Sequence, residues 1–372
     1  MNLEDRWIQC RDFLYPWLGF LEEEVLKKYP RQLPEDIIAW VKELNHLSLV
    51  ELLEFQNKLS LDKTVIDKKS CSLLTYLNSI KKITKFEKYD YSILETSNHQ
   101  RKVNPKKKHE IHKLVQLIKN SVSEKETFLD IGGGVGHLSQ ALVQAGKYFS
   151  YCVDANQQLQ VDGKKRLKKW DQESYAKIEF VTSFVNEKFK YKSFESVKDK
   201  SIIGLHPCGK LGTELIHYYD SLDKAKLFMA SCCYHKIDSA YNISKIAKQS
   251  GLVFSSNALH LAARCHAYES IQELENKITV RKYRYGLHYF KHSQGNLEFS
   301  SIGNTKLSDY KMCFRDYCLK YSMELEPYQT QLQDFYDLEK TQNLIQETIL
   351  ADIIRGLLGR VVETYLVLDR AI

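Results

Sequence analysis

A glycine-rich stretch near residue 130 constrains the fold of this chain more than any other feature of its sequence. An apolar run from 128 to 131 is followed by glycines at every second position, and apolar residues at helical spacing begin directly afterwards, at Leu138. This order predicts a buried strand, a tight turn and the start of a helix. Such a turn is typical of a nucleotide-binding site.

The spacing of the glycines indicates which kind of cofactor the turn accepts. The sequence reads Asp-x-Gly-x-Gly-x-Gly, and His137 stands where the dinucleotide pattern needs its third glycine. The pattern therefore favours S-adenosylmethionine over NAD. A second apolar run ends in an acid about 20 residues later, where a carboxylate can accept both ribose hydroxyls. We expect the cofactor-binding residues to be Asp130, Gly132, Gly134, Gly136 and Asp154.

Further strands and helices alternate along the chain beyond this acid. Apolar runs at 178–181, 201–205 and 227–231 predict three more strands, separated by helical segments. This alternation is typical of a parallel, doubly wound sheet with helices on both faces. The sequence before residue 101 shows only helical patterns. We therefore expect an N-terminal α-helical domain, residues 1–100, and an α/β domain with a Rossmann-like sheet, residues 101–372.

Polar side chains cluster after the fourth and fifth predicted strands. The carboxyl ends of neighbouring parallel strands lie at the same edge of a sheet and line the ligand crevice. We therefore expect the two groups within about 10 Å of each other, across strands about 4.8 Å apart. The candidate catalytic residues are His206, Cys208, Tyr234 and His235.

The same cluster has an alternative interpretation as a zinc site. Histidine and cysteine are both zinc ligands, and Cys232 and Cys233 add two more thiols. Because the C-x-x-C spacing of a zinc knuckle is missing, we expect no metal. We expect the cysteines to pack or to donate weak hydrogen bonds. The ligands in the alternative would be His206, Cys208, Cys232 and Cys233.

Two basic clusters are candidates for contact with nucleic-acid phosphates. The first precedes the helix in front of the glycine strand, where a solvated linker fits equally well. The second interleaves cations with aromatic rings, which suits phosphates and stacked bases but also a half-buried edge strand. The candidate substrate-binding residues are Lys106, Lys107, Lys108, Arg281, Lys282 and Arg284. Beyond them, a long amphipathic helix at 345–366 is expected to pack on the sheet.

Composition excludes several classes of protein. No apolar run reaches the ~20 residues that a membrane span needs, and the N-terminus lacks a signal-peptide core, so we expect a cytoplasmic protein without membrane contact. Nine cysteines without a secretory signal indicate reduced thiols rather than disulfides. The net charge of +7 is modest and identifies no partner by itself.

Taken together, these motifs resemble a known family. The chain is similar, from about residue 100 to 372, to the methyltransferase-like proteins named for a ribosomal RNA adenine dimethylase domain. The His-x-Cys-Gly and Cys-Cys-x-His pieces are also similar to tRNA 2′-O-methyltransferases that act on position four of the acceptor stem. The residues that carry the likeness lie at 104–110, 130–136, 204–209, 231–234 and 361–370.

The chain departs from these relatives in two places. The Asn/Asp-Pro-Pro-Tyr/Phe type of motif that adenine dimethylases place after strand four is absent, and His206-Pro207-Cys208 stands there. Relatives also continue past the Asp-Arg pair at 369–370 with a chain able to supply the last sheet strands, so we expect either a short sheet or a truncated sequence.

The resemblance implies a class I S-adenosylmethionine-dependent methyltransferase that acts on RNA, either tRNA or rRNA. Asp130 would accept a hydrogen bond from the cofactor's methionine amino group or from a bound water. His206 or His235 would remove a proton if the acceptor is a hydroxyl. One rival is a methyltransferase of proteins or small molecules. Another is a non-catalytic module that binds S-adenosylmethionine or RNA.

Overall fold

The computed structural model describes residues 2–28, 33–61, 71–87, 103–237, 242–264, 267–296, 298 and 302–372. The chain divides into two compact units. Unit 1 combines Met1–Lys85 with Ser244–Ile372, and unit 2 is Phe86–Ile243. The expected domain boundary at residues 100 and 101 lies outside the described residues. The division differs from the expected one because the last third of the chain packs with the N-terminal helices.

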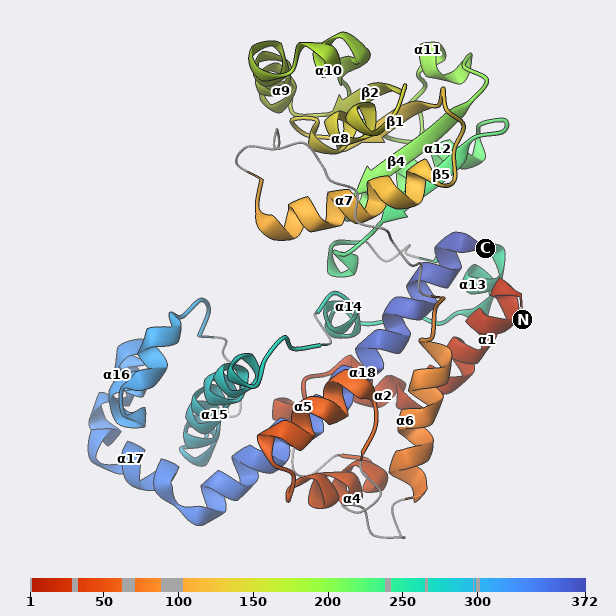
Figure 1. Ribbon diagram of the computed structural model, residues 1–372. Helices are drawn as coiled ribbons and strands as arrows, with labels where there is room; N and C mark the ends of the chain where they lie inside the picture. Colours follow the sequence, from red (N-terminus) through yellow and green to blue (C-terminus); the bar gives the residue numbers. More distant parts are fainter. Residues whose placement is uncertain are drawn as a thin grey trace. The chain divides into compact units, whose positions relative to one another are not determined.

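Unit 2 contains a parallel sheet of five strands in the order β3-β2-β1-β4-β5 (Figure 1). This confirms the predicted α/β, Rossmann-like architecture. Each predicted strand lies within a residue or two of the observed one. The strands are β1 Thr127–Ile131, β2 Phe149–Asp154, β3 Ile178–Thr182, β4 Lys200–Leu205 and β5 Lys226–Ala230.

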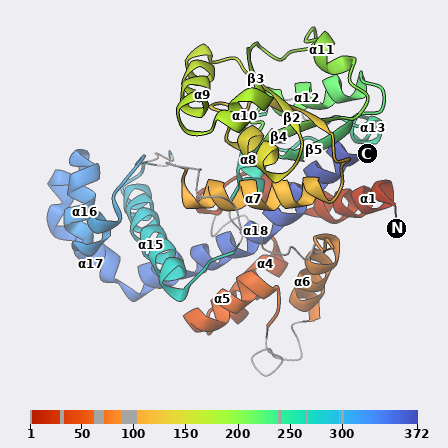
Figure 2. The same ribbon diagram turned by 45° about the horizontal axis from the view of Figure 1, so that its top comes forward.

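Helices cover both faces of this sheet because β1 is apolar on both sides. Phe128 joins the core under α7 and α8, whereas Leu129 and Ile131 join the core under α11 and α12. Figure 2 shows α7 beside α8 on the first face. The helices are α7 Pro105–Lys119, α8 His137–Ala145, α9 Gln157–Trp170, α10 Gln172–Lys177, α11 Lys192–Glu195, α12 Lys210–Asp220 and the 3₁₀ turn η2 Tyr234–Lys236.

Helix α9 packs closely on the glycine turn because it carries a glycine of its own. A Cβ on Gly163 would lie 2.6 Å from the ring of Phe180 and 2.7 Å from the carbonyl oxygen of Val135. Gly136 caps α8 with φ +78°, a left-handed conformation that a side chain would strain. The turn, α8 and α9 therefore fit together only with small residues at these two positions.

Unit 1 is entirely helical in its described residues. Its elements are α1 Leu3–Leu14, η1 Tyr15–Trp17, α2 Leu18–Glu22, α3 Val25–Lys28, α4 Glu35–Leu44, α5 Leu49–Lys58, α6 Cys71–Ile83, α13 Lys245–Ser250, α14 Ser256–Ala262, α15 Ile271–Ser293, η3 Leu307–Lys311, α16 Phe314–Tyr321, η4 Met323–Tyr328, α17 Gln329–Asp337 and α18 Glu339–Ala371. None of the described helices has both the length and the apolar character that a membrane span requires.

Helix α18 is the central element of unit 1 and is buried on nearly every side. It packs against α1, α4, α14 and α15, where the sequence suggested the sheet as its partner (Figure 2). The Tyr365 ring lies 4.8 Å from that of Trp7 in α1. The buried Arg355 donates to the carbonyl oxygens of Phe20 and Leu21, at 2.9 and 2.7 Å. Both ends of the described chain therefore contribute to one core.

Replacing Gly163 with alanine should destabilise the chain, because the added methyl group must displace either the Phe180 ring or the Val135 carbonyl. Overpacking of this kind costs about 1–3 kcal/mol. The matched control is Gly356→Ala in α18, where nothing lies within 4 Å of the added Cβ. That variant should gain about 0.5–1 kcal/mol, since alanine is the better helix former. Urea unfolding, monitored by circular dichroism, measures the free energy of unfolding of both variants. Equal stability of the two variants would contradict the packing described for α9.

Candidate functional site

The glycine turn after β1 is held in place from four directions. The amides of Gly132 and Gly133 both donate to the Val153 carbonyl at the end of β2, at 2.9 and 3.1 Å. The Gly134 amide donates to Asp154 Oδ2 at 2.9 Å. Two side chains of α9 bind the turn's carbonyls: Gln160 Nε2 donates to Gly134, and Arg166 Nη2 to Val135. The turn is thus fixed by the protein's own groups.

A cavity of about 270 Å³ opens beside this turn, at the carboxyl ends of β1, β2 and β3. Its walls are largely apolar, with Asp154 as one of the charged groups. Each oxygen of Asp154 already accepts one backbone N–H, from Gly134 and from Asn156. A carboxylate offers about four lone-pair positions, so two remain for a ligand. The lining residues are Gly132, Val153, Asp154, Ala155, Ser183, Phe184, Val185, Asn186, Lys210, Leu211 and Glu214.

Asp130 lies beneath the turn and is only 1% exposed. Its Oδ2 accepts a hydrogen bond from Ser139 Oγ at 2.7 Å, so the carboxylate connects β1 to α8. Burial raises its pKa to about 6, although hydrogen bonds from Ser139 and the charge of Lys107 oppose the rise. Asp130 therefore connects β1 to α8 next to the turn, and its contact with a cofactor stays a prediction.

His137, which replaces the third glycine of the dinucleotide pattern, is the first residue of α8. Burial lowers the pKa of His137 to about 4, and the charges of Arg166 and Lys107 add to the effect. The imidazole is therefore neutral at neutral pH.

The N-terminal turn of α7 lies close to the glycine turn. Lys107 is near enough to Asp130 and His137 to lower the pKa of both groups. Lys106 and Lys107 are exposed and Lys108 is half-buried. One turn further along, Glu110 Oε2 lies 2.9 Å from Nε2 of His206, at the end of β4. The segment interpreted as a linker or a phosphate contact thus reaches the carboxyl edge of the sheet.

The loops after β4 and β5 meet at this edge, as the sequence predicted. His206 adopts φ +62°, an unusual conformation for a residue with a side chain, and its amide donates to the Ala230 carbonyl. A Cβ on Gly209 would lie 2.7 Å from the carbonyl oxygen of Lys236. The absence of a side chain at Gly209 therefore lets the second loop approach the first.

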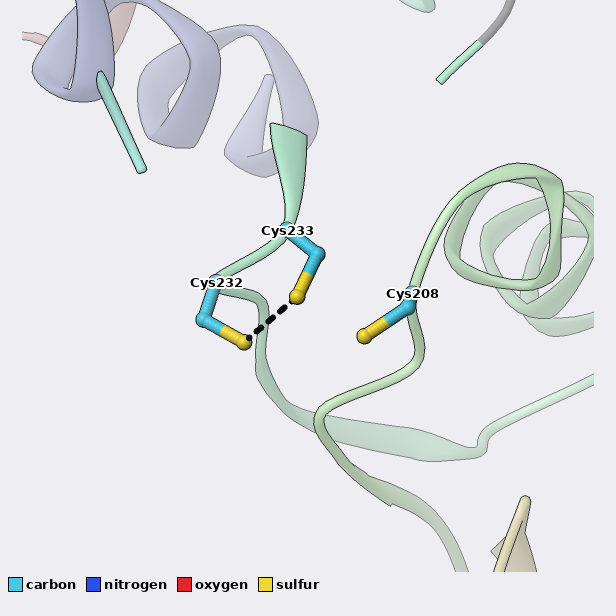
Figure 3. A group of neighbouring side chains, drawn as sticks. All are labelled: Cys208, Cys232 and Cys233. Carbon is cyan, nitrogen blue, oxygen red and sulfur yellow. Dashed lines mark hydrogen bonds between the residues drawn. The ribbon is translucent and has the colours of Figure 1, made fainter. Parts of the chain in front are cut away.

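Three thiols converge where these loops touch. The sulfur atoms of Cys208, Cys232 and Cys233 lie within 4.8 Å of one another and point toward a common centre (Figure 3). Cys232 Sγ is 3.4 Å from Cys233 Sγ and 2.9 Å from Nδ1 of His206. The two predicted groups are therefore in direct contact.

The three thiols differ in how readily they ionise. Burial, followed by interactions with Cys233, raises the pKa of Cys232 to about 12, and burial also raises that of Cys208. Burial raises the pKa of Cys233 as well, but hydrogen bonds from the other two thiols and the charge of Lys236 leave it below its ordinary value. Cys233 is thus the first of the three thiols to ionise.

Two further candidates follow directly after the thiols, in η2. Tyr234 is 1% exposed, and its hydroxyl donates to the Ser231 carbonyl at 3.4 Å. His235 is half-buried. The tyrosine ring is therefore part of the packing of this loop, and His235 is the more accessible of the two.

The match to known families covers all of these elements. Residues 106–240 match the model of a family described as a methyltransferase domain. Over these residues unit 2 is similar to methyltransferase domains. No curated protein matches the chain.

The second basic cluster lies outside the residues that match the family model, in unit 1. It forms part of helix α15, which excludes the alternative of a half-buried edge strand. Arg281 pairs with Asp352 at 3.1 Å, and Arg284 donates to Gly303, Thr305 and Tyr310. Lys282 is half-buried on the same helix. Arg281 and Arg284 line a cavity of about 570 Å³ and are engaged within unit 1, so the expected phosphate contacts do not follow from the structure.

Several side chains of the candidate site were not predicted from the sequence. Gln160 and Arg166 hold the glycine turn, and Phe184, 71% exposed, stands at the cavity after β3. Glu110 orients His206. Glu110 follows Lys107 by three residues and so shares a helix face with it. This spacing is a weak indication that both side chains face the same site.

The stability of the chain should depend on pH through Asp130. Its folded pKa, about 6, exceeds the ordinary aspartate value of about 3.8, so its contribution is complete below about pH 4 and is lost as pH rises through 6. The total loss is about 3 kcal/mol. Asp130→Asn still accepts from Ser139 but does not ionise. Between pH 4.5 and 7.5 its free energy of unfolding should rise by about 2 kcal/mol relative to wild type. Urea unfolding at both pH values tests this, and a constant difference would show that Asp130 is not titrating there.

Proposed function

We propose that unit 2 is an S-adenosylmethionine-dependent methyltransferase that acts on RNA. The observation that carries the cofactor assignment is the cavity beside the glycine turn, where Asp154 keeps two lone-pair positions for a ribose diol. The apolar walls of the cavity suit a purine ring. When bound, the cofactor supplies an electrophilic methyl group.

The chain's own residues have three tasks in this proposal. Gly132, Gly134 and Gly136 let the backbone approach the cofactor, and Asp154 binds its ribose. The carboxyl ends of β4 and β5 receive the acceptor, because ligands of open parallel sheets bind at this edge. Alignment of the acceptor lone pair with the methyl group then supplies most of the rate enhancement.

The proton acceptor for a hydroxyl substrate is assigned to His235 in this proposal. Both ring nitrogens of His206 already have partners, Glu110 and Cys232, whereas His235 lies on the same edge in the next loop. A general base that accepts the proton in the transition state contributes typically 10²–10⁴-fold to the rate.

RNA is favoured as the substrate by the position of the first basic cluster. Lys106 and Lys107 are exposed on the turn of α7 that lies near Asp130 and His137. Cations at the mouth of the site would neutralise phosphates beside the reacting nucleotide. The cluster at 281–284 does not support the RNA proposal, because Arg281 and Arg284 bind partners within unit 1.

Asp154→Asn should weaken binding of S-adenosylhomocysteine about tenfold or more, since hydrogen bonds to a charged group contribute about 1.5–3 kcal/mol. Calorimetric titration measures the affinity. Asp162→Asn, an equal charge change at an exposed position of α9, is the control and should bind normally. Unchanged affinity of the Asp154 variant, or tight binding of NAD by wild type, would refute the cofactor assignment.

The substrate class is tested by incubating the full chain with labelled S-adenosylmethionine and total RNA or total protein from the source cell. Label should enter RNA, and the triple change of Lys106, Lys107 and Lys108 to glutamate should reduce transfer strongly at moderate salt. The matched control changes Lys164, Lys165 and Lys168, which are exposed on α9. Label in the protein fraction would favour the protein rival, and no transfer at all would favour the non-catalytic module.

His235→Gln should lower the rate of transfer to a hydroxyl acceptor at least 100-fold while leaving S-adenosylhomocysteine affinity unchanged. Single-turnover kinetics on the labelled substrate measures the chemical step. A normal rate would mean that the acceptor needs no proton removal by this imidazole.

A further inference from the structure

The thiol cluster of unit 2 has no task in the methyl transfer proposed above. Three sulfur atoms face a common centre at the ends of two strands (Figure 3). An imidazole nitrogen, Nδ1 of His206, lies 2.9 Å from one of them, Cys232 Sγ. Thiols elsewhere in the described chain, such as the exposed Cys71 and Cys313, belong to no comparable group of metal-ligating side chains. An arrangement of three sulfurs and one nitrogen matches a common ligand set of structural zinc sites.

We propose that His206, Cys208, Cys232 and Cys233 bind one zinc ion. In a tetrahedral site with Zn–S bonds of about 2.3 Å, neighbouring ligand atoms lie about 3.8 Å apart. The sulfurs of Cys232 and Cys233 are already 3.4 Å apart, and all three sulfurs lie within 4.8 Å. Shifts of up to about an ångström along the sulfur–sulfur edges bring the three thiols to this spacing, and Nδ1 of His206, 2.9 Å from Cys232 Sγ, supplies the fourth ligand.

Glu110 sets the tautomer that zinc binding requires. Its carboxylate accepts a hydrogen bond from Nε2–H of His206 at 2.9 Å, which leaves the lone pair of Nδ1 directed at the thiols. A carboxylate behind a ligating histidine is the usual outer partner at zinc sites. Glu110 is therefore a positioning residue for the metal, and it comes from α7, far from the ligands in sequence.

The backbone around the cluster is built to hold this arrangement. His206 keeps φ +62°, although a histidine rarely adopts this conformation, and such outliers gather at functional sites. Gly209 admits the loop that carries Cys233 to a distance that a side chain would forbid. The two strand ends thus replace the C-x-x-C knuckle whose absence led the sequence analysis to expect no metal.

This inference does not depend on the proposed methyl transfer. Its consequence for that proposal is that His206 and Cys208 would be ligands, which leaves His235 as the base. Zinc bound here would also fasten α7, β4 and β5 together at the edge where the acceptor would bind.

The first test measures the metal content of the full chain, purified under reducing conditions without chelators. We expect close to one zinc ion per chain by elemental analysis, and X-ray absorption with three sulfur neighbours at about 2.3 Å and one nitrogen. Cobalt substitution should produce sulfur-to-cobalt charge-transfer absorption. Protein that takes up no zinc after reduction and reconstitution would overturn the proposal, as would a disulfide between two of these cysteines in the freshly purified chain.

The second test identifies the ligands. Cys208→Ser, Cys232→Ser and Cys233→Ser should each lose the zinc, whereas Cys71→Ser and Cys313→Ser should retain it. His206→Asn removes the imidazole but tolerates the left-handed backbone, so loss of zinc with normal circular dichroism reports ligation rather than misfolding. Full zinc occupancy in the Cys208 and Cys232 variants would refute the site.

The role of Glu110 is tested by two variants. Glu110→Ala should weaken zinc binding about 10–100-fold in competition with a chromophoric chelator. Glu110→Gln retains an oxygen that accepts from Nε2 and should recover most of the affinity. Equal affinity of the alanine variant and wild type would show that Glu110 does not position His206.

Discussion

Unit 2 depends on the attachment of the glycine turn to β2 and α9. The turn gives two amides to the Val153 carbonyl and one to Asp154, and it receives side-chain donors from Gln160 and Arg166. Because every one of these partners comes from β2 or α9, the turn is held only when both β2 and α9 are in place. The cavity beside it is therefore preformed rather than created by a ligand.

Much of this unit could be predicted from sequence because its signals are local. Apolar runs marked the five strands, and the residues after β4 and β5 indicated where two loops would meet. What could not be predicted depends on long-range contacts. Glu110 lies in a lysine-rich run, and nothing near it in sequence points to His206. The expectation of no metal rested on ligand spacing along the chain, which says little about side chains that meet at the ends of separate strands.

Unit 1 was harder to interpret for the same reason. Arg281 and Arg284 alternate with aromatic residues, a composition shared by nucleic-acid surfaces, edge strands and half-buried helices. Their real partners, Asp352 and the segment around Thr305, are distant in sequence. The final helix was correctly expected, but its apolar pairs do not say which surface they cover. In the structure this helix contacts the Trp7 ring and the carbonyls of Phe20 and Leu21, near the other end of the chain.

The discontinuity of unit 1 affects how the protein is made. Its first helices leave the ribosome long before α18, which packs against α1 and α4. At 5–20 residues per second, roughly 15–60 s separate the synthesis of α6 from the end of α18. Unit 2 is synthesised wholly within that interval and can fold during it. The apolar faces of the early helices stay uncovered until α18 has been synthesised. During translation these segments are therefore the part of the chain with the greatest need for a chaperone.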